Sequence, residues 1–178
     1  MLEYILIIIW FYFPAGAANM APVLFKWVPF LNYPVDLGKK FSGQPIFGSH
    51  KTYRGFVVGI LAAVAWLALQ RYIYNINPSY ALIDYNSINI WLLGFLMGFG
   101  ALFGDLARSF IKRRLGIEPG KPWFPWDQVD FILGAIIFSY LYIPLSGDIL
   151  IAAVVLGIVL HPAFNYMGYL CRVKKNKF

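Results

Sequence analysis

Five long apolar stretches run through the chain, and they restrict it to a helical membrane fold. The stretches cover residues 3–31, 55–74, 88–111, 128–145 and 149–170. A helix needs about 20 apolar residues to cross about 30 Å of hydrocarbon, and each stretch reaches or approaches that length. We therefore predict an all-α, polytopic integral membrane protein, with five transmembrane helices in a single domain over residues 1–178.

The composition agrees with a polytopic membrane protein. The chain is 60% hydrophobic and only 13% charged, whereas about a quarter of the residues in a soluble domain are charged. The first stretch has no basic segment before it and no small-residue cleavage site after it, so we expect a retained span and not a removed signal. A lone cysteine, Cys171, excludes an internal disulfide and a multi-cysteine metal site.

Basic residues gather in alternate loops, and this distribution predicts the topology. The formal net charge is +7, and twelve of the 15 lysines and arginines fall in the loop 32–54, the loop 112–127 and the C-terminal tail. Cytoplasmic loops carry the excess of such cations. We therefore place both loops and the C-terminus in the cytoplasm and the N-terminus outside. We attribute the positive net charge to this topology. We therefore expect no nucleic-acid partner.

Acidic and basic side chains meet where the third apolar stretch ends, in the segment GDLARSFIKRRLG at 104–116. On a helix, four of its polar residues share one stripe. These are Asp105, Arg108, Ser109 and Lys112. Asp127 and Asp130 are three positions apart at the start of the fourth stretch, so they also share a face. Two helix ends therefore present three carboxylates, with the cations of the loop 112–127 between them.

This mixture of charges is typical of enzymes that transfer phosphoryl or nucleotidyl groups. Mg²⁺ prefers carboxylates together with substrate phosphates, and lysine and arginine bind phosphate. Such a transfer needs both, because negative charge spreads over the transferred phosphorus in the transition state. An ion-pair cluster that only orders the loop is the alternative.

The first long loop and three polar residues in the apolar stretches allow two interpretations each. The segment 34–55 has four glycines and four cations that suit phosphate, but it has no Walker A motif, and a solvated basic loop containing His50 is the alternative. Asn19, His161 and Asn165 indicate either a polar pocket or hydrogen bonds between helices.

Small residues recur four apart in the third stretch, as Gly94-x3-Gly98 and Gly100-x3-Gly104. Glycines at this spacing let helix backbones approach closely. We expect this packing to be within the chain and not between two copies of it.

The segment from 104 to 130 resembles the signature of the CDP-diacylglycerol synthase family. The matching residues are Gly104, Asp105, Leu106, Ser109, Lys112, Arg113, Asp127 and Asp130. Two features differ from that signature: Gln128 stands where the family has arginine, and PGKPWFPW at 119–126 replaces a segment rich in glycine and histidine.

The whole chain is more similar to a shorter archaeal branch, the CDP-archaeol synthases. Three further motifs, in order, carry this likeness. They are AN-x-AP (Ala18, Asn19, Ala21, Pro22), PVD-x-GK (Pro34, Val35, Asp36, Gly38, Lys39) and G-x2-KT-x-RG (Gly48, Lys51, Thr52, Arg54, Gly55).

The resemblance implies a reaction in which a prenyl ether lipid phosphate, 2,3-di-O-geranylgeranylglyceryl phosphate, attacks CTP at the cell membrane. CDP-archaeol and pyrophosphate are the implied products, and membrane lipids are the implied surroundings. Asp105, Asp127 and Asp130 are then the Mg²⁺ ligands. The implied nucleotide or phosphate contacts are Lys112, Arg113, Ser109, Lys51 and Arg54, and we add Lys121 and Asn19 as candidates. Lys112 joins the three aspartates as a candidate catalytic residue.

Two other functions compete with this interpretation. A membrane CDP-alcohol phosphotransferase has the signature D-G-x2-A-R-x8-G-x3-D-x3-D, whereas this chain has Asp105-Leu-Ala-Arg108 and acids spaced by three at 127 and 130. A non-enzymatic nucleotide or anion transporter needs a route to the outer side, and the predicted outer loops carry almost no charge.

Overall fold

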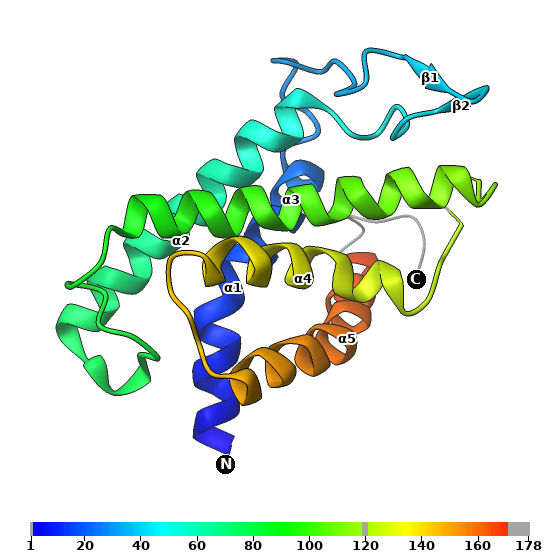
Figure 1. Ribbon diagram of the computed structural model, residues 1–178. Coiled ribbons are helices and arrows are strands. Elements are labelled where there is room, and N and C mark those ends of the chain that lie inside the picture. Colours follow the sequence, from blue (N-terminus) through cyan, green and yellow to red (C-terminus); the bar gives the residue numbers. More distant parts are fainter. Residues whose placement is uncertain (1, 119–120, 171–178) are drawn as a thin grey trace.

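The computed structural model describes residues 2–118 and 121–170, with side chains up to residue 161, and this part of the chain is mostly helical (Figure 1). The helices are α1 (Leu2–Leu24), α2 (Tyr53–Ile76), α3 (Ile90–Arg114), α4 (Trp126–Tyr140) and α5 (Gly147–Leu170). A short 3-10 helix, η1 (Pro78–Tyr80), follows α2. The predicted helical fold is confirmed in its five helices, and the described residues add one short β-hairpin. Cys171 and the tail cations lie outside the described residues.

Two helices are shorter than the apolar stretches that predict them. α1 ends at Leu24 and not at 31, and Leu31 itself has a left-handed φ of 49°, which no helix accommodates. α4 has 15 residues, a length of about 22 Å at 1.5 Å per residue. Within the described residues, α1, α2 and α3 are long and apolar enough to cross a membrane. Crossing by α4 and α5 stays a prediction.

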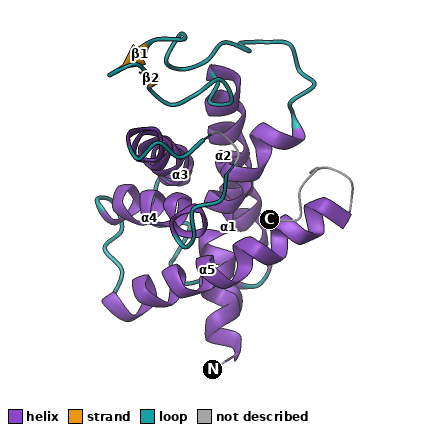
Figure 2. Cartoon of the chain, turned by 90° about the vertical axis from the view of Figure 1, so that its right-hand side faces the viewer, coloured by secondary structure: helices purple, strands orange, loops and turns teal. Residues whose placement is uncertain are grey.

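α3 is the central helix, and glycines set its distance from two neighbours. It packs against α1, α2 and α4, and both views show α4 alongside it with α5 beyond (Figures 1 and 2). Gly94 and Gly98 face the backbone of α2 at Val64 and Ile60. Gly100 and Gly104 face the backbone of α4 at Gly134 and Asp130. The expected close packing within the chain is therefore confirmed on two faces of α3.

Apolar side chains fill the space between these helices. Buried members of this core come from all five helices. They include Phe11, Leu67, Leu93, Met97 and Ile132. This core fixes α3 and α4 relative to the rest of the bundle, so the polar groups at their ends have fixed positions.

The first long loop has an ordered structure of its own. Strands β1 (Lys40–Phe41) and β2 (Gln44–Pro45) form an antiparallel hairpin joined by Ser42 and Gly43. Both joining residues have positive φ, 50° and 79°, as the tight two-residue turn requires. The loop ends at Thr52, whose side chain accepts a hydrogen bond from the Gly55 N–H and caps α2.

A buried carboxylate organises the same loop. Asp36 accepts hydrogen bonds from the backbone N–H groups of Gly38 at 3.0 Å, Phe47 at 3.0 Å and Gly48 at 3.1 Å. Burial raises the pKa of the Asp36 carboxyl, but these hydrogen bonds outweigh it and hold that pKa below its usual value. The folded conformation of the loop therefore depends on an ionised Asp36.

Both long loops lie at the same end of the bundle, as the charge distribution predicts. The guanidinium of Arg114, at the end of α3, donates to the carbonyl oxygens of Phe41 and Pro45 at 2.5 Å each. It also lies over the rings of Phe41 and Phe110, 5.2 and 5.0 Å from their centroids. The N-terminus lies at the opposite end (Figure 1). Which end faces the cytoplasm stays a prediction.

Candidate functional site

The end of α3 and the start of α4 bring the three predicted acidic residues together. Asp105 lies on α3, and Asp127 and Asp130 lie in the first two turns of α4. Gly104 allows the approach, because a Cβ there would meet the backbone carbonyl of Asp130. The close helix packing therefore sets the spacing of the carboxylates.

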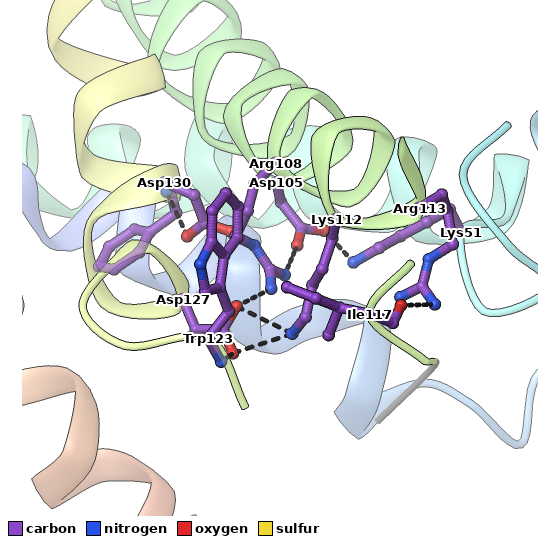
Figure 3. A network of polar contacts seen from close by, with 10 residues as sticks. Lys51, Asp105, Arg108, Lys112, Arg113, Ile117, Trp123, Asp127 and Asp130 are labelled. Carbon is purple, nitrogen blue, oxygen red and sulfur yellow. Dashed lines mark hydrogen bonds and ion pairs between the residues drawn. The ribbon is translucent and has the colours of Figure 1, made fainter. Parts of the chain in front are cut away.

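The guanidinium of Arg108 lies between the three carboxylates (Figure 3). Its Nη2 donates to Oδ1 of Asp105 at 2.7 Å, and its Nε donates to Oδ2 of Asp130 at 2.5 Å. Its Nη1 donates to Oδ1 of Asp127. Three nitrogens of one planar group thus each bind a different carboxylate.

Two lysines complete the cluster. Lys51, from the first loop, donates to Oδ2 of Asp105. Lys112, one turn of α3 beyond Arg108, donates to both oxygens of Asp127 at 3.1 Å. The three acids and three cations have formal charges that cancel, which makes their burial possible.

Burial strengthens these interactions. The side chain of Asp130 is 4% exposed and that of Lys112 is 6% exposed. Charges in such surroundings interact far more strongly than charges on a surface. As the side chains stand, no group of three or more His, Cys, Asp or Glu among the described residues is placed to hold a metal ion. The Arg108 guanidinium fills the space between the carboxylates.

Other predicted site residues lie near the cluster or away from it. Ser109 and Arg113 are buried on the last turns of α3, and Nη1 of Arg113 donates to the carbonyl oxygen of Ile117 at 2.6 Å. Lys121 is exposed in the following loop. Asn19 is half-buried on α1.

Arg54 is not part of the cluster, although it lies three residues after Lys51. Its Nη1 donates to the carbonyl oxygens of Lys26 at 2.8 Å and Val28 at 2.6 Å, and the residue is buried. Arg54 therefore holds the chain that leaves α1. A role for it in nucleotide binding stays a prediction, as do the roles of the other predicted site residues.

Sequence reasoning placed Arg108 on the acidic stripe but gave it no role, and it missed Arg114 and Asp36. The i,i+3 spacing of Asp105 and Arg108 was a signal for an ion pair between them. Asp36 also had a signal, since aspartate two residues before glycine favours a turn held by its side chain. Arg114 had none, because its partners are about 70 positions earlier in the chain.

Of the two polar candidates on α5, the structure describes the side chain of His161. The ring of His161 lies 5.7 Å from that of Phe131 on α4. The side chain of Asn165 lies outside the described part of the structure. Neither interpretation of these residues is decided.

An apolar groove of about 240 Å³ opens between α3 and α4 beside the cluster. Its walls are mostly aromatic and aliphatic, and Arg108 and Asp130 are the charged residues in its lining. The aromatic residues in its lining are Phe103, Trp123, Trp126 and Phe138. A charged centre next to an apolar groove suits a ligand with a phosphate head and an apolar tail.

Comparisons with known proteins agree with the resemblance found in the sequence. A family model described as CDP-archaeol synthase (CarS-like) matches residues 1–178. The CDP-archaeol synthase of Archaeoglobus fulgidus is 38% identical over 183 residues and covers 98% of each chain. That of Methanocaldococcus jannaschii is 34% identical over 168 residues and covers 93% of each.

A solved structure is similar as well. It is described as an intramembrane enzyme for archaeal membrane lipids biosynthesis. Its TM-score is 0.72 at 33% identity, over 88% of this chain and 91% of that one. These matches favour a synthase over a phosphotransferase or a transporter.

The chain is thus a membrane protein and a nucleotidyltransferase. Its relatives are similar to it over nearly their whole length, since the matches run over nearly all of both chains. This chain belongs to the CDP-archaeol synthase family, and it acts in archaeal membrane lipid biosynthesis.

Proposed function

We propose that the chain joins CTP to 2,3-di-O-geranylgeranylglyceryl phosphate in a Mg²⁺-dependent reaction that gives CDP-archaeol and pyrophosphate. One observation carries this proposal: Asp105, Asp127 and Asp130 each turn one oxygen toward the same guanidinium, that of Arg108, with Lys51 and Lys112 beside them. The site takes CTP from the cytoplasm and the lipid phosphate from the bilayer.

The donor set fits Mg²⁺. The three oxygens that bind the Arg108 guanidinium are all carboxylate oxygens, the ligand type that this ion prefers. Asp105, Asp127 and Asp130 would hold the ion. When bound, Mg²⁺ neutralises charge on the phosphates and polarises them toward attack.

The cations of the site bind the triphosphate. Lys112 and Arg113 are buried at the end of α3, where their charges act in a medium of low polarity. Ser109, on the same stripe, donates a hydrogen bond to phosphate. Lys51 adds a charge from the first loop, and Arg54 anchors that loop to the chain after α1.

The groove between α3 and α4 supports a lipid as the second substrate. Its walls are mostly apolar, and Arg108 and Asp130 of the cluster are part of its lining. An apolar chain in this groove brings its phosphate to the cluster. The prenyl ether lipid phosphate has the required shape.

The reaction then needs no general base. An oxygen of the ionised lipid phosphate attacks the α-phosphorus of CTP, a new P–O bond forms, and the bond to the β-phosphate breaks. Pyrophosphate leaves with the electron pair. The work of the chain is to hold the two phosphates in line and to neutralise the charge that develops.

An assay of four nucleoside triphosphates against ether- and ester-linked lipid phosphates tests the proposal. We expect pyrophosphate and a CDP-lipid from CTP with the ether lipid, only when Mg²⁺ is present. Absence of pyrophosphate would contradict the proposal and favour a transporter. Release of CMP with consumption of a CDP-lipid would instead indicate a phosphotransferase.

A further inference from the structure

Arg108 uses one oxygen of each carboxylate. It binds Oδ1 of Asp105, Oδ1 of Asp127 and Oδ2 of Asp130 through three different nitrogens. These three oxygens therefore face the place where the guanidinium lies. A single planar cation thus neutralises the three side chains that we propose as metal ligands.

The other oxygen of each carboxylate has a partner of its own. Oδ2 of Asp105 binds Lys51, and Oδ1 of Asp130 accepts from the backbone N–H of Phe131 at 2.6 Å. Oδ2 of Asp127 accepts from the backbone N–H of Trp123 at 2.7 Å and from Lys112 at 3.1 Å. Lys112 also donates to Oδ1 of Asp127 at 3.1 Å. These partners hold the carboxylates in place if Arg108 moves, which frees one oxygen on Asp105 and one on Asp130 and leaves Oδ1 of Asp127 with Lys112 alone.

We propose that the Arg108 guanidinium exchanges with the divalent cation of the reaction, so that Arg108 holds the three carboxylates until metal and nucleotide arrive together. This inference rests on the proposed function, which supplies the metal and the triphosphate. Arg108 is a positioning residue in this scheme.

Charge explains why the exchange requires both ligands. With Arg108 in place, the cluster is formally neutral, and a divalent cation added alone meets the guanidinium as a like charge. A triphosphate changes the balance, since a displaced guanidinium pairs with phosphate oxygens in a bidentate manner. Metal and nucleotide then raise each other's affinity by the same factor.

The surroundings leave room for this movement. Arg108 lines the groove between α3 and α4, whose lining near the cluster includes Trp123 and Trp126. The side chain of Arg108 is 16% exposed, so it is not enclosed on every side. A guanidinium also packs favourably over aromatic rings.

Binding of Mn²⁺, followed by electron paramagnetic resonance on the full chain in detergent, tests the exchange without any turnover. We expect weak binding of Mn²⁺ alone to the wild type and at least tenfold tighter binding to Arg108→Gln. Arg71→Gln is the matched control, because Arg71 bonds Asn86 near the far end of α2, and its Mn²⁺ affinity should equal that of the wild type. Equal or weaker Mn²⁺ binding by Arg108→Gln would overturn the inference.

A measurement on the wild type keeps the inference testable if Arg108→Gln does not fold. A non-hydrolysable CTP analogue should tighten Mn²⁺ binding to the wild type at least tenfold. Arg108→Lys should bind Mn²⁺ alone more tightly than the wild type, because one ammonium cannot replace three directed nitrogens. Identical Mn²⁺ affinities with and without the analogue would overturn the inference. If the wild type still released pyrophosphate from CTP, the proposed function would stand.

Discussion

Lys51 donates to Oδ2 of Asp105, and this ion pair joins the first loop to the acidic cluster across 54 positions of sequence. The loop is therefore part of the site and not only a connection between α1 and α2. Its internal order, through Asp36 and the hairpin, determines where the ammonium of Lys51 lies.

We expect Lys51→Gln to raise the KM for CTP about tenfold or more, because a hydrogen bond to a charged group contributes about 1.5–3 kcal/mol. Steady-state kinetics in detergent measure this change. Lys40→Gln is the control, because Lys40 is exposed in the same loop. A KM for CTP that is the same in both variants and the wild type would remove Lys51 from the site.

Asp130→Asn should leave a folded protein with turnover reduced about 100-fold or more, because a buried metal ligand loses its charge. Circular dichroism and gel filtration check the fold, and pyrophosphate release measures turnover. Asp84→Asn, at an exposed position before α3, serves as the control and should keep its activity. Normal turnover by Asp130→Asn would refute the metal assignment.

Gly104→Ala should lower the free energy of unfolding by about 1–3 kcal/mol, because the added methyl group meets the backbone of Asp130. It should also reduce turnover, since α4 moves away from Asp105. The control is Gly16→Ala in α1, where a Cβ has no neighbour within 4 Å. Chemical denaturation compares the two, and equal stabilities would show that the packing is not tight.

The hydrogen bonds to Asp36 predict a dependence of loop stability on pH. Because they hold the pKa of Asp36 low, their stabilisation is complete above the unfolded value of about 3.9 and is lost as pH falls through the folded value. Hydrogen-exchange protection of the Phe47 and Gly48 amides, corrected for intrinsic rates, should fall in that range. In Asp36→Asn the protection should be lower and independent of pH, and an unchanged pH profile in that variant would contradict the assignment.

Local patterns in the sequence were sufficient for the helices and for the acidic stripe. Apolar runs mark where helices lie, and i,i+3 and i,i+4 spacing places side chains on one face. The spacing therefore predicted that Asp127 and Asp130 would share a face of α4. It also predicted the glycine contacts of α3, because these depend on the absence of a side chain.

These local patterns could not predict contacts between distant segments of the chain. Arg108 contacts Asp127 and Asp130 only because Gly104 lets α4 approach, and nothing in either segment alone shows it. Likewise, Arg54 and Lys51 look equivalent in the loop, yet only Lys51 reaches the cluster. The length of α4 was also overestimated, since the apolar run continues past the end of the helix at Tyr140.

Transfer of label from CTP to lipid shows whether the acidic cluster performs nucleotidyl transfer. The enzyme is supplied with the ether lipid phosphate and CTP labelled with ³²P at either the α- or the γ-phosphate, with Mg²⁺ or with EDTA. We predict that only the α-label enters the lipid, only with Mg²⁺, and not in Asp130→Asn. Label entering the lipid from the γ-phosphate, or α-label entering it in the presence of EDTA, would contradict the mechanism.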